Sequence, residues 1–139
     1  MRKGNFVYNP LMNRDQTRMP KILLIDDDPF IADMYVLKFR DEQFEIETVH
    51  NGKDGLKRIE EFNPDVILLD VVMPDMDGFH VLEQLKKKGA ERKVILLTNL
   101  GQKEDVERGM SLGASDYIVK AYFTPSEVVE KVRKFLDHG

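Results

Sequence analysis

The 139-residue sequence contains no cysteine and only three histidines. Without cysteine the chain can form no disulfide, offer no thiolate nucleophile and build no cysteine metal site. His50, His80 and His138 lie too far apart in the chain to show metal-ligand spacing, and we expect them on the surface. Any metal site must therefore be built from oxygen ligands.

Long apolar runs and an excess of positive charge are also missing. No stretch approaches the roughly 20 apolar residues that cross a bilayer, and the N-terminus lacks the apolar segment of a signal peptide. A formal net charge of -4 disfavours binding to the phosphate backbone of nucleic acid, which needs a clustered basic face. We therefore expect a cytoplasmic protein with no membrane insertion and no direct nucleic-acid partner.

The chain length suits one compact domain, since a chain of this size buries roughly two thirds of its unfolded surface. Residues 1–20 show no sustained periodicity, and we expect them to form a disordered N-terminal extension. The predicted domain spans residues 21–139.

From Lys21 onward, strand-like apolar runs alternate with helical patterns. The strand-like runs are 21–26, 45–50, 65–70, 93–99 and 116–120, and the helical segments are 29–41, 53–62, 78–88, 102–111 and 125–137. Five such units predict an α/β fold with a parallel sheet covered by helices on both faces, because right-handed crossovers carry each helix over the sheet.

Local signals mark two of the helix starts and set one helix apart. Asp28 precedes a proline and is the expected N-cap of the first helix. Thr124 and Glu127 form the pattern of a capping box at the last helix. The segment 102–111 offers little beyond Val106 and Met110 for a core. We expect that helix to be either weakly held or kept exposed for a partner.

Polar side chains follow the predicted strands where each strand ends. They are Asp26, Asp27, Asp28, Asp70, Thr98 and Lys120. In an open α/β sheet the carboxyl ends of the strands border the ligand crevice, so these side chains are expected to converge. Asp70 is the most informative of them, because it ends an unbroken apolar run that reads as a strand buried on both faces.

Carboxylates gathered in one crevice repel each other unless a cation is supplied. Oxygen ligands without histidine or cysteine favour a hard ion, and a shallow site with few protein ligands suits Mg²⁺. Asp28 is better explained as a helix cap, whereas Asp26 and Asp27 have no such structural role and are the predicted metal ligands. Lys120 would place a positive charge beside this group.

These residues resemble the receiver domains of two-component response regulators, including the single-domain chemotaxis regulators. "LLIDDDP" is similar to the acidic pair of that family, "LLDVVMPDMDGF" to its phosphoacceptor segment, "ILLTN" to its threonine or serine position, and "DYIVK" to its aromatic and lysine segment. The resemblance covers residues 21–137. It implies a flavodoxin-like, doubly wound (βα)5 sheet of strand order 2-1-3-4-5.

The resemblance also implies a role for each matching residue. Asp70 would accept a phosphoryl group from a sensor histidine kinase or a histidine phosphotransfer protein. Asp26, Asp27, Asp70 and the backbone carbonyl of Val72 would hold Mg²⁺. Thr98 would donate to one phosphoryl oxygen and Lys120 would pair with another, while the aromatic switch residue Tyr117 would follow Thr98.

Two departures from the family pattern carry predictions. In the resembling family a proline joined by a cis peptide bond usually follows the lysine, and Ala121 stands at that position here. A cis bond before a residue other than proline costs about 2.5 to 4 kcal/mol, so we expect a trans bond between Lys120 and Ala121. Val72 and Leu100 occupy the positions that best orient a hydrolytic water in the family. Both are aliphatic, which predicts slow autodephosphorylation.

We interpret the chain as a signalling domain without its own output domain, a phosphoacceptor rather than a conventional enzyme. Its signal would pass to a downstream protein through the face made of the fourth helix, fifth strand and fifth helix. A haloacid-dehalogenase-type phosphatase is disfavoured, because Val72 stands where its second aspartate belongs. A flavodoxin is disfavoured because "DDDPF" would repel a flavin phosphate. An interaction module that acts without phosphorylation stays open as the alternative.

Overall fold

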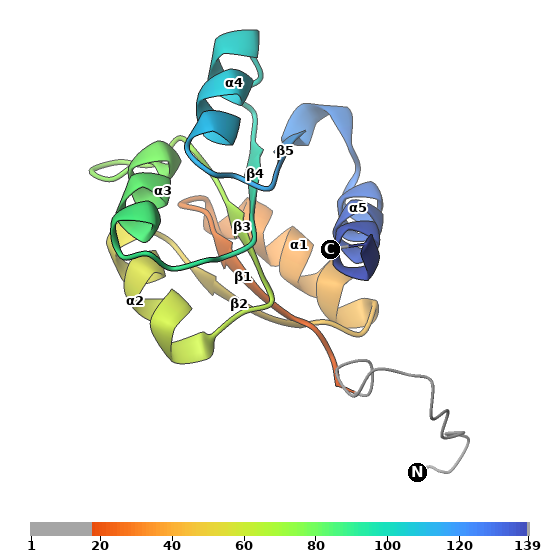
Figure 1. The fold of residues 1–139 in the computed structure, drawn as a ribbon. Coiled ribbons are helices and arrows are strands. Elements are labelled where there is room, and N and C mark those ends of the chain that lie inside the picture. The colour runs from red at the N-terminus through yellow and green to blue at the C-terminus, as the bar shows by residue number, and fades with distance from the viewer. Residues whose placement is uncertain (1–17, 139) are drawn as a thin grey trace, which may run out of the picture.

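The computed structural model describes residues 18–138, in which strands and helices alternate along the chain (Figure 1). The strands are β1 (Lys21–Ile25), β2 (Glu45–Val49), β3 (Val66–Leu69), β4 (Val94–Thr98) and β5 (Asp116–Val119). The helices are α1 (Pro29–Asp41), α2 (Gly52–Phe62), α3 (Gly78–Lys87), α4 (Lys103–Ser111), the short 3₁₀ helix η2 (Lys120–Tyr122) and α5 (Pro125–His138). The five predicted strand and helix pairs are confirmed.

All five strands run parallel in one sheet of order β2-β1-β3-β4-β5. Strand β1 pairs on both edges, and its last residue, Ile25, lies opposite Val49 of β2 and Leu69 of β3. The strand order reverses between β1 and β3, and a crevice forms at such a switch point outside the carboxyl ends of the strands. The predicted order 2-1-3-4-5 is confirmed.

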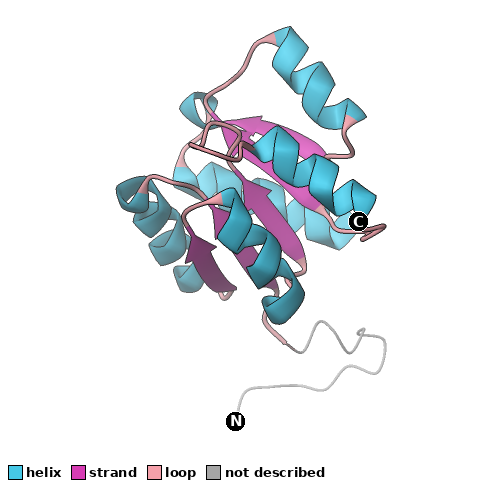
Figure 2. Ribbon diagram, turned by 90° about the vertical axis from the view of Figure 1, so that its left-hand side faces the viewer, coloured by secondary structure: helices cyan, strands magenta, loops and turns pink. Residues whose placement is uncertain are grey.

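The inner strands are apolar on both sides because helices cover both faces of the sheet. Alternate residues of β1 enter different cores: Ile22 and Leu24 pack with α1 and α5, whereas Leu23 and Ile25 pack with α2 and α3. Figures 1 and 2 show the resulting three layers, with strands between helices. This explains the unbroken hydrophobic runs, since a strand covered on both faces has no solvent side.

Both predicted helix caps are present. The Asp28 carboxylate accepts hydrogen bonds from the N–H groups of Phe30 at 3.0 Å and Ile31 at 3.2 Å, at the start of α1. Before α5, the Thr124 hydroxyl accepts from the Glu127 N–H, and the Glu127 carboxylate accepts from the Thr124 N–H. The Asp28 carboxylate is therefore engaged in capping, as expected.

Helix α4 contributes little to the core. Its buried residue is Gly109, Val106 is half-buried and Met110 is 43% exposed, which agrees with the expectation that this helix offers little to the core. A Cβ at Gly109 would lie 2.5 Å from a methyl group of Leu96 and 3.3 Å from the Tyr117 ring. The missing side chain lets α4 lie directly on β4 and β5, in place of contacts from large apolar residues.

Residues 1–17 of the predicted N-terminal extension lie outside the described part of the chain, and residues 18–20 lie within it. Arg18 forms a two-armed ion pair with Asp65 ahead of β3, with both N–O distances at 2.9 Å. The carbonyl of Pro20 accepts a hydrogen bond from the Glu45 N–H of β2 at 2.9 Å. Residues 18 and 20 are thus attached to the sheet. Among the described residues, no helix has the length and apolar character needed to span a membrane.

Candidate functional site

Asp70 stands directly after β3, where the backbone fixes the direction of its side chain. Its N–H donates to the carbonyl of Ile25 in the neighbouring strand at 2.9 Å, and the residue is only 7% exposed. The loop after Asp70 folds back so that its end contacts its start, where the Gly78 N–H donates to the Val71 carbonyl at 2.9 Å. A Cβ at Gly78 would lie 2.4 Å from the Asp70 carbonyl oxygen, so only glycine permits this approach.

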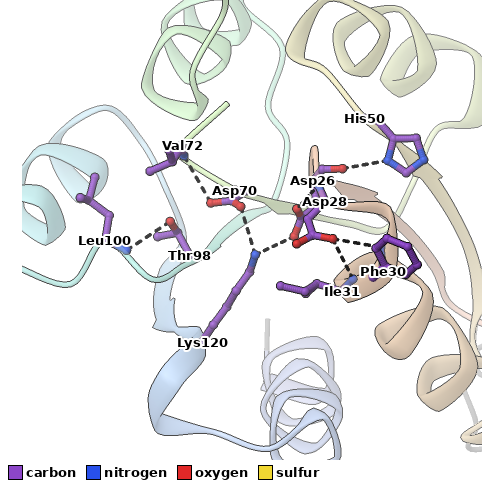
Figure 3. A network of polar contacts seen from close by, with 10 residues as sticks. All are labelled: Asp26, Asp28, Phe30, Ile31, His50, Asp70, Val72, Thr98, Leu100 and Lys120. Carbon is purple, nitrogen blue, oxygen red and sulfur yellow. Dashed lines mark hydrogen bonds and ion pairs between the residues drawn. The ribbon is translucent and has the colours of Figure 1, made fainter. Parts of the chain in front are cut away.

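Lys120 bridges two carboxylates of the crevice (Figure 3). Its Nζ lies 2.6 Å from an oxygen of Asp26 and 3.0 Å from an oxygen of Asp70. Burial raises the pKa of the Asp26 carboxyl, although hydrogen bonds from Lys120 and the Asp28 N–H oppose this shift. Burial disfavours the charged form of Lys120 as well, but the two carboxylates outweigh it and raise the pKa of the ammonium group. The lysine is therefore held as a cation inside the crevice.

Three carboxylates are close enough to share one ion. Asp26, Asp27 and Asp70 each offer an oxygen, and these three oxygens lie within 4.8 Å of one another. Asp26 is fully buried, whereas Asp27 is exposed, so the group opens to solvent on one side. Oxygen ligands with an open, hydrated side fit Mg²⁺, which keeps several waters when it binds to proteins. The residues present therefore suit the predicted ion.

Thr98 and Tyr117 meet at one residue of the loop after β4. The buried Thr98 hydroxyl accepts a hydrogen bond from the Leu100 N–H at 3.3 Å. The Tyr117 hydroxyl donates to the Leu100 carbonyl. Burial, followed by the carboxylates of Asp105 and Asp70, raises the pKa of Tyr117 to about 12. The two predicted switch residues are thus connected through the backbone of Leu100.

Val72 lies at the mouth of the crevice. Its N–H donates to the Asp70 carboxylate at 3.3 Å, so the loop after β3 folds back over Asp70. The Val72 side chain is 60% exposed. An exposed aliphatic side chain therefore stands two residues after Asp70.

The contact of His50 with an acidic residue of the crevice was not predicted from the sequence. A ring nitrogen of His50, just after β2, lies 2.9 Å from the backbone carbonyl of Asp26 (Figure 3). His50 and His80 are exposed as expected, while the side chain of His138 lies outside the described residues. Its position in the sequence could have indicated this contact, because His50 directly follows the strand β2, which pairs with β1, and so lies at the same edge of the sheet as Asp26.

The segment after Lys120 follows the expectation of a trans bond at Ala121. The described residues include no cis peptide bond. Residues Lys120–Tyr122 form the 3₁₀ helix η2, and the Phe123 N–H donates to the Lys120 carbonyl at 3.3 Å. Lys120 still reaches both carboxylates by this route.

The fold and the crevice together define a class: a flavodoxin-like domain of the chemotaxis-regulator type, with acidic residues and a lysine at the switch point of its sheet. Comparison with family models agrees, because residues 22–133 match the response regulator receiver domain. The chain belongs to this family, the receiver domains of two-component response regulators.

Relatives of two sizes are similar to this chain. It is 36% identical over 117 residues to the chemotaxis protein CheY of Listeria monocytogenes, covering 84% of this chain and 98% of that one. It is 36% identical over 120 residues to the DNA-binding dual master transcriptional regulator RpaA of Synechocystis, covering 85% of this chain but only 49% of RpaA. The chain therefore spans about half the length of such regulators.

Solved structures agree with the fold. The receiver domain of the Francisella response regulator 1452 superposes with a TM-score of 0.80 at 33% identity, over 86% of this chain and 98% of that one. A CheY-like receiver domain protein from Methanospirillum hungatei gives a TM-score of 0.79 at 31% identity, over 86% and 95% of the two chains.

Proposed function

We propose that Asp70 is the phosphoacceptor of a two-component phosphorelay. The main supporting observation is the position of Asp70 directly after a buried strand. Its carboxylate lies beside the ammonium group of Lys120 and the carboxylate oxygens of Asp26 and Asp27. A carboxylate is a weak nucleophile, and it can take a phosphoryl group only where it is aligned and its charge is balanced. The end of β3 fixes the direction of Asp70, and Lys120 provides positive charge 3.0 Å from its carboxylate, which supports the proposal.

In the proposed reaction a partner protein presents a phosphohistidine. An Asp70 carboxylate oxygen attacks the phosphorus, an O–P bond forms, and the P–N bond to the histidine breaks. The electron pair of that bond returns to the imidazole, and Asp70 becomes an acyl phosphate. The partner is a sensor histidine kinase or a histidine phosphotransfer protein.

The ligands of the metal would be Asp26, Asp27, Asp70 and the carbonyl of Val72. Bound Mg²⁺ supplies positive charge to the phosphoryl oxygens during transfer. Lys120 supplies positive charge beside Asp26 and Asp70, and the end of β3 fixes the direction of Asp70. Together these groups neutralise charge at a site prepared before the donor arrives.

Thr98 and Tyr117 carry the change to the surface. In the proposed mechanism the Thr98 hydroxyl leaves the Leu100 N–H to donate to a phosphoryl oxygen. The loop at Leu100 then moves, and the hydrogen bond from Tyr117 to its carbonyl moves with it. Because Gly109 packs on the Tyr117 ring and α4 has few other buried contacts, α4 responds to this change. The signal is a population shift of the face formed by α4, β5 and α5, which a downstream protein reads.

The test is to incubate the protein with a small phosphodonor, with and without Mg²⁺, and to record the intact mass. We expect one added phosphoryl group with Mg²⁺ and strongly reduced labelling after chelation. Asp70→Asn should remain unlabelled and folded, since asparagine has nearly the same shape. Asp75→Asn, in the exposed loop before α3, is the matched control and should be labelled like the wild type.

Absence of any adduct at high donor and Mg²⁺ concentration would contradict the proposal. It would favour the alternative, a receiver-like module that binds its partners without phosphorylation. The intact set of Asp26, Asp27, Asp70, Thr98 and Lys120 supports the phosphoacceptor, because it joins a fixed carboxylate, candidate metal ligands and a cation in one crevice.

A further inference from the structure

The backbone carbonyl of Asp26 is held by a side chain and not by the sheet. The pairing of β1 with β2 continues as far as the hydrogen bond from the Asp26 N–H to the Val49 carbonyl, at 3.1 Å. In a parallel ladder the Asp26 carbonyl would next accept from a backbone N–H on the β2 side. Within residues 18–138 no backbone N–H donates to it, and a ring nitrogen of His50 lies 2.9 Å away instead (Figure 3). The histidine therefore takes the place of the next hydrogen bond of the ladder.

The chain after β2 leaves the sheet at once because helix α2 begins there. Asn51 is the N-cap of this helix, and its side chain accepts a hydrogen bond from the Asp54 N–H at 2.8 Å. The backbone of Asn51 is thereby committed to the start of α2. His50 stands between the end of β2 and this cap, so its side chain is placed to reach back to the end of β1.

The contact requires the His50 ring to be the donor. A carbonyl oxygen only accepts hydrogen bonds, so Nδ1 must carry a proton and donate it. Asp26 is fully buried, and a buried carbonyl that lacks a partner costs free energy. His50 is exposed. A hydrogen bond from the protein surface thus fixes a buried backbone atom.

The held carbonyl belongs to the peptide group between Asp26 and Asp27. A peptide group is planar, so a hydrogen bond that fixes its carbonyl also fixes where the backbone of Asp27 begins. The Asp26 carboxylate has other partners, the Lys120 ammonium group at 2.6 Å and the Asp28 N–H at 2.9 Å. The Asp27 carboxylate forms no hydrogen bond or ion pair with any described residue. Its direction therefore depends on its backbone.

We propose that His50 is a positioning residue for the metal. Its Nδ1–H holds the peptide group of Asp26 and Asp27, so that the Asp27 carboxylate stays within reach of the ion that it shares with Asp70. The inference rests on the proposed function, in which the three carboxylates bind Mg²⁺, and their oxygens lie within 4.8 Å of one another. Hydrogen-bond partners that orient metal ligands contribute about tenfold to a hundredfold in metal affinity.

The test measures Mg²⁺ affinity without any phosphorylation. Urea unfolding midpoints of the full chain are recorded over a range of Mg²⁺ concentrations at constant ionic strength. They give the dissociation constant, because an ion that binds only the folded state raises its stability. We expect His50→Ala to raise this constant about tenfold. His80→Ala removes another exposed histidine, on α3, and is the matched control that should bind Mg²⁺ like the wild type.

His50→Asn separates positioning from bulk. The side-chain nitrogen of asparagine lies the same number of bonds from the backbone as Nδ1 of histidine, and it can donate to the Asp26 carbonyl. We expect this variant to bind Mg²⁺ with nearly the wild-type dissociation constant. Without Mg²⁺ the urea midpoints of both His50 variants should stay close to that of the wild type, because water can reach the carbonyl once the exposed ring is removed.

The amide resonance of Asp27 gives a direct view of the held peptide group, since its nitrogen belongs to that group. In nitrogen-15 spectra of the metal-free protein we expect this resonance to shift in His50→Ala and to return toward its wild-type position in His50→Asn. The resonance should not move in His80→Ala.

The outcomes separate this inference from the function on which it rests. A wild type whose midpoint does not respond to Mg²⁺ contradicts the metal site itself, and the role of His50 with it. A wild type that responds, together with a His50→Ala variant of equal Mg²⁺ affinity, contradicts the role of His50 alone. A His50→Ala variant that loses stability without metal and is not restored by asparagine shows a purely structural contact, which also overturns the proposal.

Discussion

The ammonium nitrogen of Lys120 lies 3.0 Å from a carboxylate oxygen of Asp70, a residue fifty positions earlier in the chain. The same nitrogen lies 2.6 Å from Asp26, so one lysine serves two acidic residues. Its charge stabilises both carboxylates, and it also competes with any metal that the carboxylates bind. Most of the expected behaviour of the site follows from this shared position.

Removing the lysine should cost stability that Mg²⁺ can partly restore. Lys120→Met leaves the buried carboxylates of Asp26 and Asp70 without their cation, at a cost of about 3 kcal/mol in the free energy of unfolding. The same change removes a charge that repels a metal, so the variant should bind Mg²⁺ more tightly than the wild type. Urea unfolding with and without Mg²⁺ measures both effects, with Lys57→Met, an exposed lysine, as the control. A variant as stable as the wild type would show that the bridge contributes nothing.

Mg²⁺ should stabilise the wild type through the exposed acidic residue Asp27. A metal present at ten times its dissociation constant adds about 1.4 kcal/mol to the free energy of unfolding. Asp27→Asn should lose most of that gain while leaving the metal-free stability within about 0.5 kcal/mol, because the side chain is exposed. Asp137→Asn, an exposed carboxylate on α5, should keep the full gain. An equal loss in both variants would mean that the ion binds without a specific site.

Tyr117 should make the fold sensitive to alkaline pH. Its pKa is raised from 10.0 to about 12 in the folded protein, chiefly by burial. Between these values the unfolded chain loses the phenolic proton and the folded chain keeps it, so stability falls as pH rises from 10 toward 12. Tyr117→Phe should show a smaller fall in the free energy of unfolding over this range. Absorbance titration should also lose one late phenol ionisation in the variant, and an unchanged titration curve would contradict the assignment.

Phosphate on Asp70 should be lost slowly. Water attacks the phosphorus in line and the Asp70 carboxylate leaves, so a group that positions this water speeds the step. The two positions that the family resemblance marks as best placed to orient this water hold Val72 and Leu100, whose aliphatic side chains cannot hydrogen-bond to it. If water positioning contributes about 1.4 kcal/mol to lowering the barrier, Val72→Asn with Leu100→Glu should release phosphate about tenfold faster.

The control for that experiment removes bulk without adding polar groups. Val72→Ala with Leu100→Ala removes side-chain bulk but adds no group that can hold a water, so its release rate should stay close to that of the wild type. Rates are followed at matched Mg²⁺ concentration after removal of the phosphodonor. Equal rates in the polar double variant and the wild type would show that water positioning does not limit the reaction.

The sequence predicts the alternating strands and helices and the crevice well because both depend on strong local signals, whereas the strand order 2-1-3-4-5 was implied by the family resemblance. The apolar run before Asp70 could only be a strand covered on both faces, and parallel strands must bring their carboxyl ends to one edge. The caps at Asp28 and Thr124 are equally local. These features need no knowledge of tertiary contacts.

Features that depend on distant contacts were beyond this reasoning. Met110 has the spacing of a core residue, yet Gly109 brings α4 so close to Leu96 that the helix buries its backbone instead. The contact of His50 with the Asp26 carbonyl depends on the side-by-side position of β1 and β2. The ion pair of Arg18 with Asp65 joins residues 47 positions apart, which no periodicity reveals.

The most direct test of the central claim is to locate the phosphoryl group. Protein treated with a small phosphodonor and Mg²⁺ is reduced with borohydride, which converts an aspartyl phosphate to homoserine, and is then digested and sequenced by tandem mass spectrometry. We predict homoserine at position 70 and at no other aspartate. Homoserine at Asp26, Asp27 or any other position, with Asp70 unchanged, would contradict the account.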